Sequence, residues 1–459
     1  MRVIFLLFFF LYGLWTLFRS IGLPYVMDLI VTLPISLAIV SYFIWEPFKN
    51  SERRQRWSLI DLRSSKTMIL GILLGLNFIL LSAAFFRVMV LSMQYLWILS
   101  ISMFLYAVFR WYFERDALDQ FLQDLTISVV IMVGMNAACY LFGFENPAEA
   151  ENYHRDFDAL FNLLNARFYF PFTTSTRILS IFSGTGFLLA LFTPFRWKSK
   201  TAVVMFRVFG SIVCLFVLVA AGARMPFLVF VVCALLGLFW DRIGRMGVYI
   251  GTAAAVLLPG IVLGSAQLQT WLQARADLPS IVDRIFTALT ISNRHIIWAG
   301  AFTGAFRNLS AALFGHGIFG HLTSGASRLY AYLFEVSWTR PTMMPAHNSY
   351  IQILLDGGLM GLLSFLALIG VLLWKLPVVA ESLTAHFSNS QAGEHVERSL
   401  SIPLLYLFMT ASTEVSLSYI APELLYLLIA FLFLLILGPG TRTLMQTGED
   451  DSDRVISPG

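Results

Sequence analysis

A histidine and several arginines stand where long apolar runs of this sequence begin or end. His347 and Asn348 lie directly before one apolar run, and Arg224 lies in the short turn 220–226 between two others. A guanidinium is a planar fork of donors that fits phosphate and keeps its charge. An imidazole, with an ordinary pKa of about 6.5, can act as base, acid or phosphate donor. These residue types predict a site that binds phosphate and moves a proton.

Arg224 and Arg294 are the strongest phosphate candidates. No acid lies near Arg224 in the sequence, and an unpartnered cation at the depth of an apolar span costs a few kcal/mol, so an anionic ligand is expected. Arg294 and Trp298 are four residues apart and share a helix face, which places the indole at the membrane interface. The alternative for any one arginine is that it snorkels to the interface or pairs with an acid. The set near the predicted outer surface comprises Arg177, Arg224, Arg284, Arg294, Arg307 and Arg340.

Glycines and one acid accompany the histidine. The run 315–320 is rich in glycine and predicts a turn that lets backbones approach closely. Asp356, Gly357 and Gly358 follow His347 by a little over two helical turns and predict close packing of a neighbouring helix. Glu414, near the outer end of a later apolar run, is either an acid that orients the histidine or the partner of an arginine. As an alternative to a catalytic role, a histidine at the start of a helix is typical of a helix cap.

Other chemistries find little support in the residues. Asp156 and Asp158 have the spacing by which some glycosyltransferases hold a divalent cation, but the acid-rich loop around them favours a solvated segment. His316 and His321 lack carboxylate or thiolate partners at zinc-ligand spacing. Neither a metal nor another cofactor is therefore expected. The net charge of +4 comes without a basic run interleaved with aromatics, so nucleic acid is not an expected partner.

The elements that must position these residues are membrane helices. Of the 459 residues, 58% are hydrophobic and 13% are charged, whereas soluble domains carry roughly 25% charged residues. Apolar runs of about 17 to 25 residues match the length that crosses a bilayer as a helix. The sequence predicts an all-α bundle of about twelve transmembrane helices. The predicted spans are 3–18, 25–45, 67–86, 88–109, 122–143, 176–192, 202–220, 226–240, 246–265, 348–374, 401–416 and 420–438.

Orientation follows from the basic residues, because short cytoplasmic loops collect lysine and arginine. With the N-terminus inside, every lysine lies on the cytoplasmic side. The acid-rich segment 144–175 and the longest segment, 266–347 between helices nine and ten, are then outside. Residues 1–440 are predicted to form one membrane domain with membrane lipids as its surroundings. The tail 441–459 lacks apolar periodicity and is predicted to be a disordered cytoplasmic segment.

A family resemblance is carried by Arg224 after an apolar span, Arg294 with Trp298, the glycines at 315 and 317, and His347-Asn348 followed by 357–361. In order and context these pieces resemble the O-antigen ligase and polymerase superfamily, integral membrane glycan transferases of bacterial surface polysaccharide assembly. The resemblance covers roughly residues 175–440. Members often carry serine before the first arginine, where this chain has Ala223, which weakens the alignment of Arg224.

The resemblance implies both an activity and roles for residues. Members take a glycan from a polyprenyl (undecaprenyl) diphosphate donor at the periplasmic face of the inner membrane, without a metal. Ligases transfer it to lipid A-core, polymerases join repeat units, and related enzymes glycosylate proteins. By resemblance, Arg224 and Arg294 bind the donor diphosphate, and His347 orients or deprotonates the acceptor hydroxyl. Supporting candidates are Asn348, Arg284, Arg340 and Glu414.

Two other classes of function stay open at this point. A flippase or transporter of lipid-linked glycans would also need an arginine-lined path, although its charges are expected within the spans and not at their outer mouth. A scaffolding protein of an envelope complex would not explain the His-Asn pair and the arginines on one side. Ligase, polymerase and protein-glycosylating activities share one donor and differ in acceptor, so the residues do not separate them.

Overall fold

The computed structural model describes residues 1–20, 92–145, 170–173, 175–273, 294–335, 341–384, 392–417 and 421–437. These residues form helices and connecting turns, and none of them lies in a strand. Four of the described helices are long and apolar enough to cross a membrane. The described part of the chain is therefore all-helical, and its apolar helices indicate a membrane protein, as the composition predicts.

Each predicted span within the described residues coincides with a helix, whereas the spans 25–45 and 67–86 lie outside them. The apolar helices are α1 (Arg2–Leu6), α2 (Phe8–Ser20), α7 (Ser92–Phe113), α8 (Leu118–Leu141), α10 (Thr176–Phe192), α11 (Lys200–Ala220), α12 (Arg224–Leu238), α13 (Trp240–Gln273), α19 (Ser349–Thr384), α20 (Ala392–Ala411) and α21 (Pro422–Ile436). The tail 441–459 also lies outside the described residues.

Short polar residues set several helix starts. Ser175 accepts a hydrogen bond from the backbone N–H of Arg177 at the start of α10, and Ser199 accepts one from Ala202 at the start of α11. The amide oxygen of Asn348 accepts from the N–H of Ile351 at the start of α19. Such caps satisfy backbone donors that the first helical turn leaves without partners. They fix where Arg177 and His347 stand relative to their helices.

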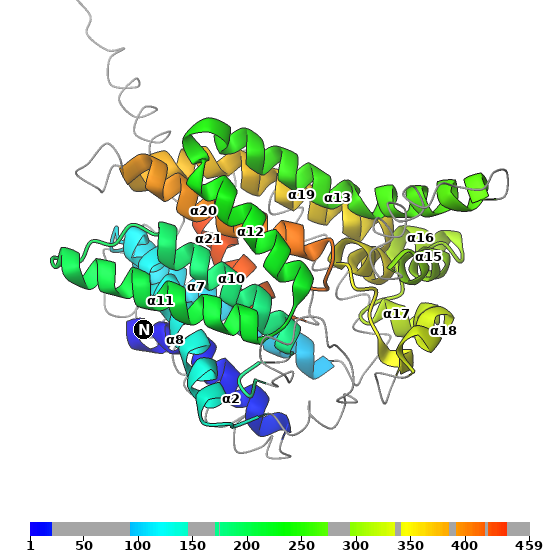
Figure 1. The fold of residues 1–459 in the computed structure, drawn as a ribbon, viewed down its shortest axis with the longest axis horizontal. Coiled ribbons are helices and arrows are strands. Elements are labelled where there is room, and N and C mark those ends of the chain that lie inside the picture. The colour runs from blue at the N-terminus through cyan, green and yellow to red at the C-terminus, as the bar shows by residue number, and fades with distance from the viewer. Residues whose placement is uncertain are drawn as a thin grey trace, which may run out of the picture.

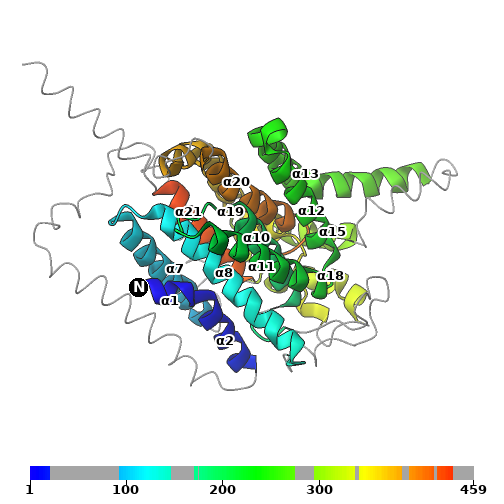
Figure 2. The ribbon, with the colours of Figure 1, turned by 60° about the vertical axis from the view of Figure 1, so that its left-hand side comes forward.

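Helix α10 lies at the centre of the bundle, in contact with α8, α11, α12, α20 and α21. Figure 2 shows α8, α10 and α11 side by side. The Tyr406 ring of α20 packs so closely over Gly184 of α10 that a Cβ there would overlap it, and its hydroxyl donates to the Pro226 carbonyl of α12. This contact fixes α10, α12 and α20 relative to one another.

Short helices gather at one end of the bundle, below called the α15–α18 end (Figure 1). They are α15 (Arg294–Ala305), α16 (Leu309–Phe314), α17 (Gly320–Thr323) and α18 (Ala326–Tyr330), followed by the 3-10 turns η5 (Ala331–Phe334) and η6 (Pro341–Met343). They enclose a second apolar core around Trp298, Tyr330 and Leu355. This arrangement attaches the segment before His347 to the first turns of α19.

Glycines allow that attachment, as the sequence predicts. A Cβ on Gly315 would overlap the Asp356 carbonyl, and a Cβ on Gly358 would overlap the backbone of Leu313. Because glycine has no Cβ, the two backbones approach closely, and the N–H groups of His316 and Gly317 donate to the carbonyls of Leu355 and Asp356. Gly358 breaks α19 with φ 64° and ψ −164°, a conformation open almost only to glycine.

We expect Gly358→Ala to destabilise the protein by about 1–3 kcal/mol, because alanine adds both backbone strain and the overlap with Leu313. Gly357→Ala is the matched control, since it is helical and a Cβ there meets nothing within 4 Å. Alanine at that position should leave the melting temperature of the detergent-solubilised protein equal or slightly higher. Equal melting temperatures for the two variants would contradict this account of the glycine break.

Candidate active site

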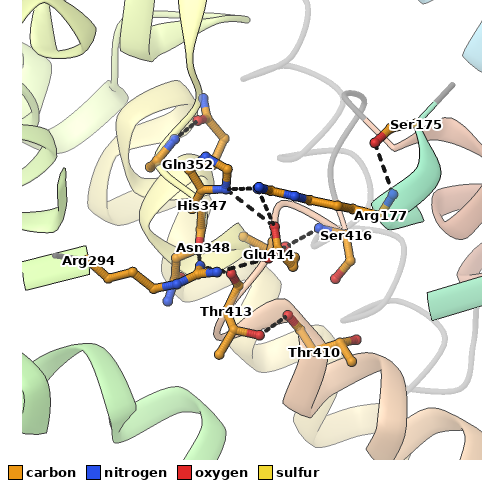
Figure 3. Close-up of polar contacts among 12 residues, drawn as sticks. Ser175, Arg177, Arg294, His347, Asn348, Gln352, Thr410, Thr413, Glu414 and Ser416 are labelled. Carbon is orange, nitrogen blue, oxygen red and sulfur yellow. Dashed lines mark hydrogen bonds and ion pairs between the residues drawn. The ribbon is translucent and has the colours of Figure 1, made fainter. Parts of the chain in front are cut away.

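Four polar side chains from separate parts of the chain meet at the α15–α18 end (Figure 3). Arg177 is in the first turn of α10, Arg294 is the first residue of α15, and His347 lies just before α19. Glu414 was expected within the span 401–416, but α20 ends at Ala411 and leaves it in the following turn. The turn gives the carboxylate access to both arginines and to the histidine.

Arg294 is fastened to protein oxygens. Its Nη1 donates to the carbonyl of His347 at 2.7 Å and to the carbonyl of Thr413, and its Nη2 donates to Glu414 Oε1 at 2.9 Å. The side chain is 12% exposed. The fork of donors thus joins the residue before α19 to the turn after α20.

Asn348 and the following serine complete the connection between these two segments. The Asn348 amide donates to the Ser412 carbonyl at 2.6 Å. The Ser349 hydroxyl donates to the Glu414 carbonyl and accepts from the N–H groups of Ser416 and Leu417. All of these groups are buried, so the bonds form where water does not compete. Asn348 therefore supports the site by holding the Glu414 turn.

His347 adopts an uncommon backbone conformation, with φ 50°. Its Nδ1 lies 3.3 Å from Glu414 Oε2 and 3.4 Å from Arg177 Nη1. The ring of Phe334 stacks on the imidazole with centroids 5.6 Å apart. Its Nε2 is buried and has no hydrogen-bond partner among the described residues. One ring nitrogen is thus held by Glu414, while the other keeps its hydrogen-bonding capacity for a ligand.

The electrostatics favour an ionised glutamate and a neutral histidine. Burial alone would raise the pKa of Glu414, but the Arg294 charge, the hydrogen bond with His347 and the Arg177 charge hold it well below its usual value. Burial lowers the pKa of His347, and the two arginine charges add to that, against the opposing effect of Glu414. A carboxylate only accepts hydrogen bonds, so we assign the proton to Nδ1 and the lone pair to Nε2.

A second buried network lies behind His347. The Gln352 amide donates to His321 Nδ1 and to Asp356 Oδ1, and its oxygen accepts from the N–H of Ala346. Burial lowers the pKa of His321 to about 4, which keeps this ring neutral. The network holds Ala346, and through it the backbone of His347, in place.

Trp298 belongs to the same support and not to a membrane interface. It shares α15 with Arg294, as expected, but its ring is fully buried and its Nε1 donates to the Ala346 carbonyl at 3.0 Å. Tyr330 is also buried and donates to the Met344 carbonyl. The segment between α13 and α19 packs around an apolar core of its own, which buries aromatics that hydropathy alone would assign to the interface.

The other sequence candidates are placed as follows. Arg224 is the first residue of α12 and its side chain is exposed. Helix α12 packs on α10, whose first turn carries Arg177, and on α20, which ends shortly before Glu414. Arg284 and Arg340 lie outside the described residues, as do Asp156 and Asp158. Within the described part of the chain, no three His, Cys, Asp or Glu side chains are grouped so that they could hold a metal ion.

Residues 209–366 match the family model described as O-antigen ligase. This match covers about a third of the chain and supports the resemblance to the O-antigen ligase and polymerase superfamily. The superfamily match runs from α11 into α19 and contains Arg224, Arg294 and His347, whereas Arg177 and Glu414 lie outside it. Among curated proteins and among solved structures, no match to the chain was found.

The match supports glycan transfer of the ligase or polymerase type in general. The sequence resemblance singles out Arg224, Arg294 and His347, with Glu414 as a supporting candidate. The structure brings Arg294, His347 and Glu414 together. It adds Arg177, which nothing in the sequence distinguishes from the other outer arginines, and the supporting pair His321 and Gln352. The position of Arg177 beside His347 could not be predicted from local sequence, because the two residues are 170 positions apart in the chain.

Proposed function

We propose that this protein transfers a glycan from a polyprenyl diphosphate donor to an acceptor hydroxyl, at the periplasmic face of the bacterial inner membrane. The observation that carries the proposal is the arrangement around His347. The imidazole is neutral, Nδ1 is held by an ionised glutamate, and the buried Nε2 has no partner among the described residues. Two arginines stand beside it. A base next to fixed positive charge is what displacement of a diphosphate by a hydroxyl needs.

In the proposed reaction, the acceptor oxygen attacks the anomeric carbon of the donor glycan. Its proton passes to Nε2 of His347, the new carbon–oxygen bond forms, and the bond from the anomeric carbon to the phosphate oxygen breaks. The electron pair of that bond leaves with the polyprenyl diphosphate. Glu414 stabilises the imidazolium that forms, while it keeps the ring in the tautomer with its lone pair on Nε2. After release of the products, the histidine returns its proton to solvent.

Positive charge is proposed to stabilise the leaving diphosphate. Arg224 and Arg294 are the residues that the family resemblance assigns to this role, and both are arginines, whose forks suit phosphate oxygens. The charge of Arg294 is fixed within the site by its bonds to the protein. Such preorganised charge stabilises a transition state without reorganisation during the reaction. The proposed chemistry therefore proceeds on the charges of the protein, without a metal or another cofactor.

The acceptor distinguishes the members of this group. In a ligase, the acceptor hydroxyl would belong to lipid A-core. In a polymerase, it would belong to a second lipid-linked glycan, and in a protein-glycosylating relative, to a protein side chain. We propose a ligase or polymerase of surface polysaccharide assembly, O-antigen or exopolysaccharide. The family match itself is to O-antigen ligase.

Product analysis tests this function. The purified full-length chain would be placed in liposomes with a polyprenyl diphosphate-linked oligosaccharide and candidate acceptors, and the products followed by mass spectrometry. We expect one free polyprenyl diphosphate for each new glycosidic bond. Movement of intact donor across the bilayer, with no cleavage in the presence of any acceptor, would contradict transfer and favour the carrier alternative.

A further inference from the structure

The two arginines beside His347 are held in different ways. Three bonds to protein oxygens occupy Nη1 and Nη2 of Arg294, and its side chain is 12% exposed. The guanidinium could turn to a phosphate only by breaking bonds that hold the Glu414 turn and the backbone of His347. Each of these buried, charge-assisted bonds is costly to lose.

Arg177 makes weaker contacts at the same site. Its Nη1 lies 3.4 Å from His347 Nδ1 and 4.0 Å from Glu414 Oε2, and its side chain is 32% exposed. The proton on Nδ1 points to Glu414, so the contact between two donors, Arg177 and Nδ1, adds no attraction. Arg177 also lies in the first turn of α10, where the helix dipole disfavours a cation. The long contacts with His347 and Glu414 and the exposed part of the side chain make this guanidinium accessible to an incoming anion.

The charges of the cluster are not balanced. Among the described residues of the cluster, Arg177 and Arg294 carry two positive charges, Glu414 carries one negative charge, and His347 is neutral, which leaves one positive charge on these four side chains. Such a charge, partly removed from water, favours binding of an anion. Of the two cations, Arg177 has the more exposed side chain.

We propose that Arg177 binds the donor diphosphate directly, and that Arg294 acts mainly as a positioning residue that holds Glu414 and His347. This division of roles rests on the proposed transfer function. Arg294 still contributes its charge, but from a fixed place. Arg177 exchanges its long contacts with His347 and Glu414 for two short bonds to phosphate oxygens, as its fork allows.

This exchange links donor binding to the strength of the base. The described charged or titratable groups around His347 are Arg177 from α10, Arg294 from α15, Glu414 after α20 and His321 from α17. The Arg177 charge lowers the pKa of His347. A bound diphosphate neutralises that charge, so His347 becomes a stronger base when the donor is in place. The acceptor hydroxyl is then activated most strongly when the donor is bound beside it.

Donor binding and the pH profile of Arg177→Gln test the proposal together. The wild-type chain and the variant, each in lipid nanodiscs, would be titrated with undecaprenyl diphosphate and with undecaprenyl monophosphate. We expect the Kd for the diphosphate to rise at least tenfold, with a smaller change for the monophosphate, which offers fewer oxygens to a fork. The matched control is Arg328→Gln, an exposed arginine on α18, which should bind as wild type does.

The pH dependence of kcat/KM in the free enzyme gives the second readout. Since the charge of Arg177 lowers the pKa of His347, its removal raises that pKa. A base works only when it is deprotonated, so the acid limb of the profile should move to higher pH. Arg177→Lys keeps the charge, and it should leave the limb in place while it still weakens diphosphate binding. If Arg177 had only a structural role, Arg177→Lys would not weaken diphosphate binding while it leaves the acid limb in place.

The outcomes distinguish this inference from the proposed function. Wild-type affinity and an unchanged acid limb in both Arg177 variants, while wild type still transfers glycan, would overturn the role of Arg177 alone. Failure of the wild type to bind undecaprenyl diphosphate or to transfer glycan would instead contradict the proposed function. Arg294→Lys should lower kcat and leave the diphosphate Kd near wild type, because one ammonium cannot reach His347, Thr413 and Glu414 together.

Discussion

Replacing His347 with alanine should lower kcat for glycan transfer by about 10²–10⁴-fold, the usual contribution of a general base. The acceptor hydroxyl then loses the imidazole whose buried Nε2, without a partner among the described residues, is proposed to take its proton. Binding of undecaprenyl diphosphate should remain close to wild type, because the arginines are still present. Steady-state transfer and a separate donor titration, both on the purified chain, would measure the two quantities.

A second histidine supplies the control for this variant. His395 is exposed near the start of α20, and His395→Ala should transfer glycan at the wild-type rate. If His347→Ala is folded, as judged by its melting temperature, and retains more than a tenth of wild-type kcat, His347 is not the base. Loss of donor binding along with transfer would instead place the imidazole against the diphosphate.

Glu414→Gln is expected to have the next largest effect. The amide keeps the shape of the side chain but loses the charge that holds Nδ1–H and stabilises the imidazolium, so kcat should fall by about 10²-fold or more. Glu414 raises the pKa of His347 through its hydrogen bond and its charge. Its neutralisation therefore lowers that pKa further, and the acid limb of kcat/KM should move to lower pH.

The direction of this shift is the informative part, because Arg177→Gln predicts the opposite one. In wild type, burial already holds the pKa of His347 below its usual value of 6.5, so the acid limb should lie below that pH. A positioning role for Glu414 requires both a lower kcat and the shift to lower pH. A fall in kcat with an unmoved acid limb would show that the carboxylate supports the fold of the turn and does not act on the histidine.

Much of the fold and part of the site follow from local sequence. The apolar runs predict the helices within the described residues, since a bilayer requires stretches of that length. The glycines at 315 and 358 indicate close backbone contact, and the structure confirms it. His347 and Asn348 can be recognised in the sequence, because polar residues at the start of an apolar helix indicate a helix cap or a functional site.

The remaining features depend on contacts between distant segments. Arg177 resembles any interfacial arginine until α10 is placed against the segment before α19. Trp298 was expected at the interface, because hydropathy cannot show that the segment between α13 and α19 forms a core of its own. Glu414 had two possible roles, orienting acid or arginine partner, and the geometry gives it contacts of both kinds.

The central claim, that donor and acceptor meet at the cluster of Arg177, Arg294, His347 and Glu414, is tested most directly by imaging the ligand. An electron cryo-microscopy structure of the full-length chain in nanodiscs with undecaprenyl diphosphate would locate the phosphates. We expect them against Arg177, with Nε2 of His347 facing the position of the glycan and with the bonds of Arg294 to the protein intact. Diphosphate bound at the opposite end of the bundle, away from these residues, would contradict the account.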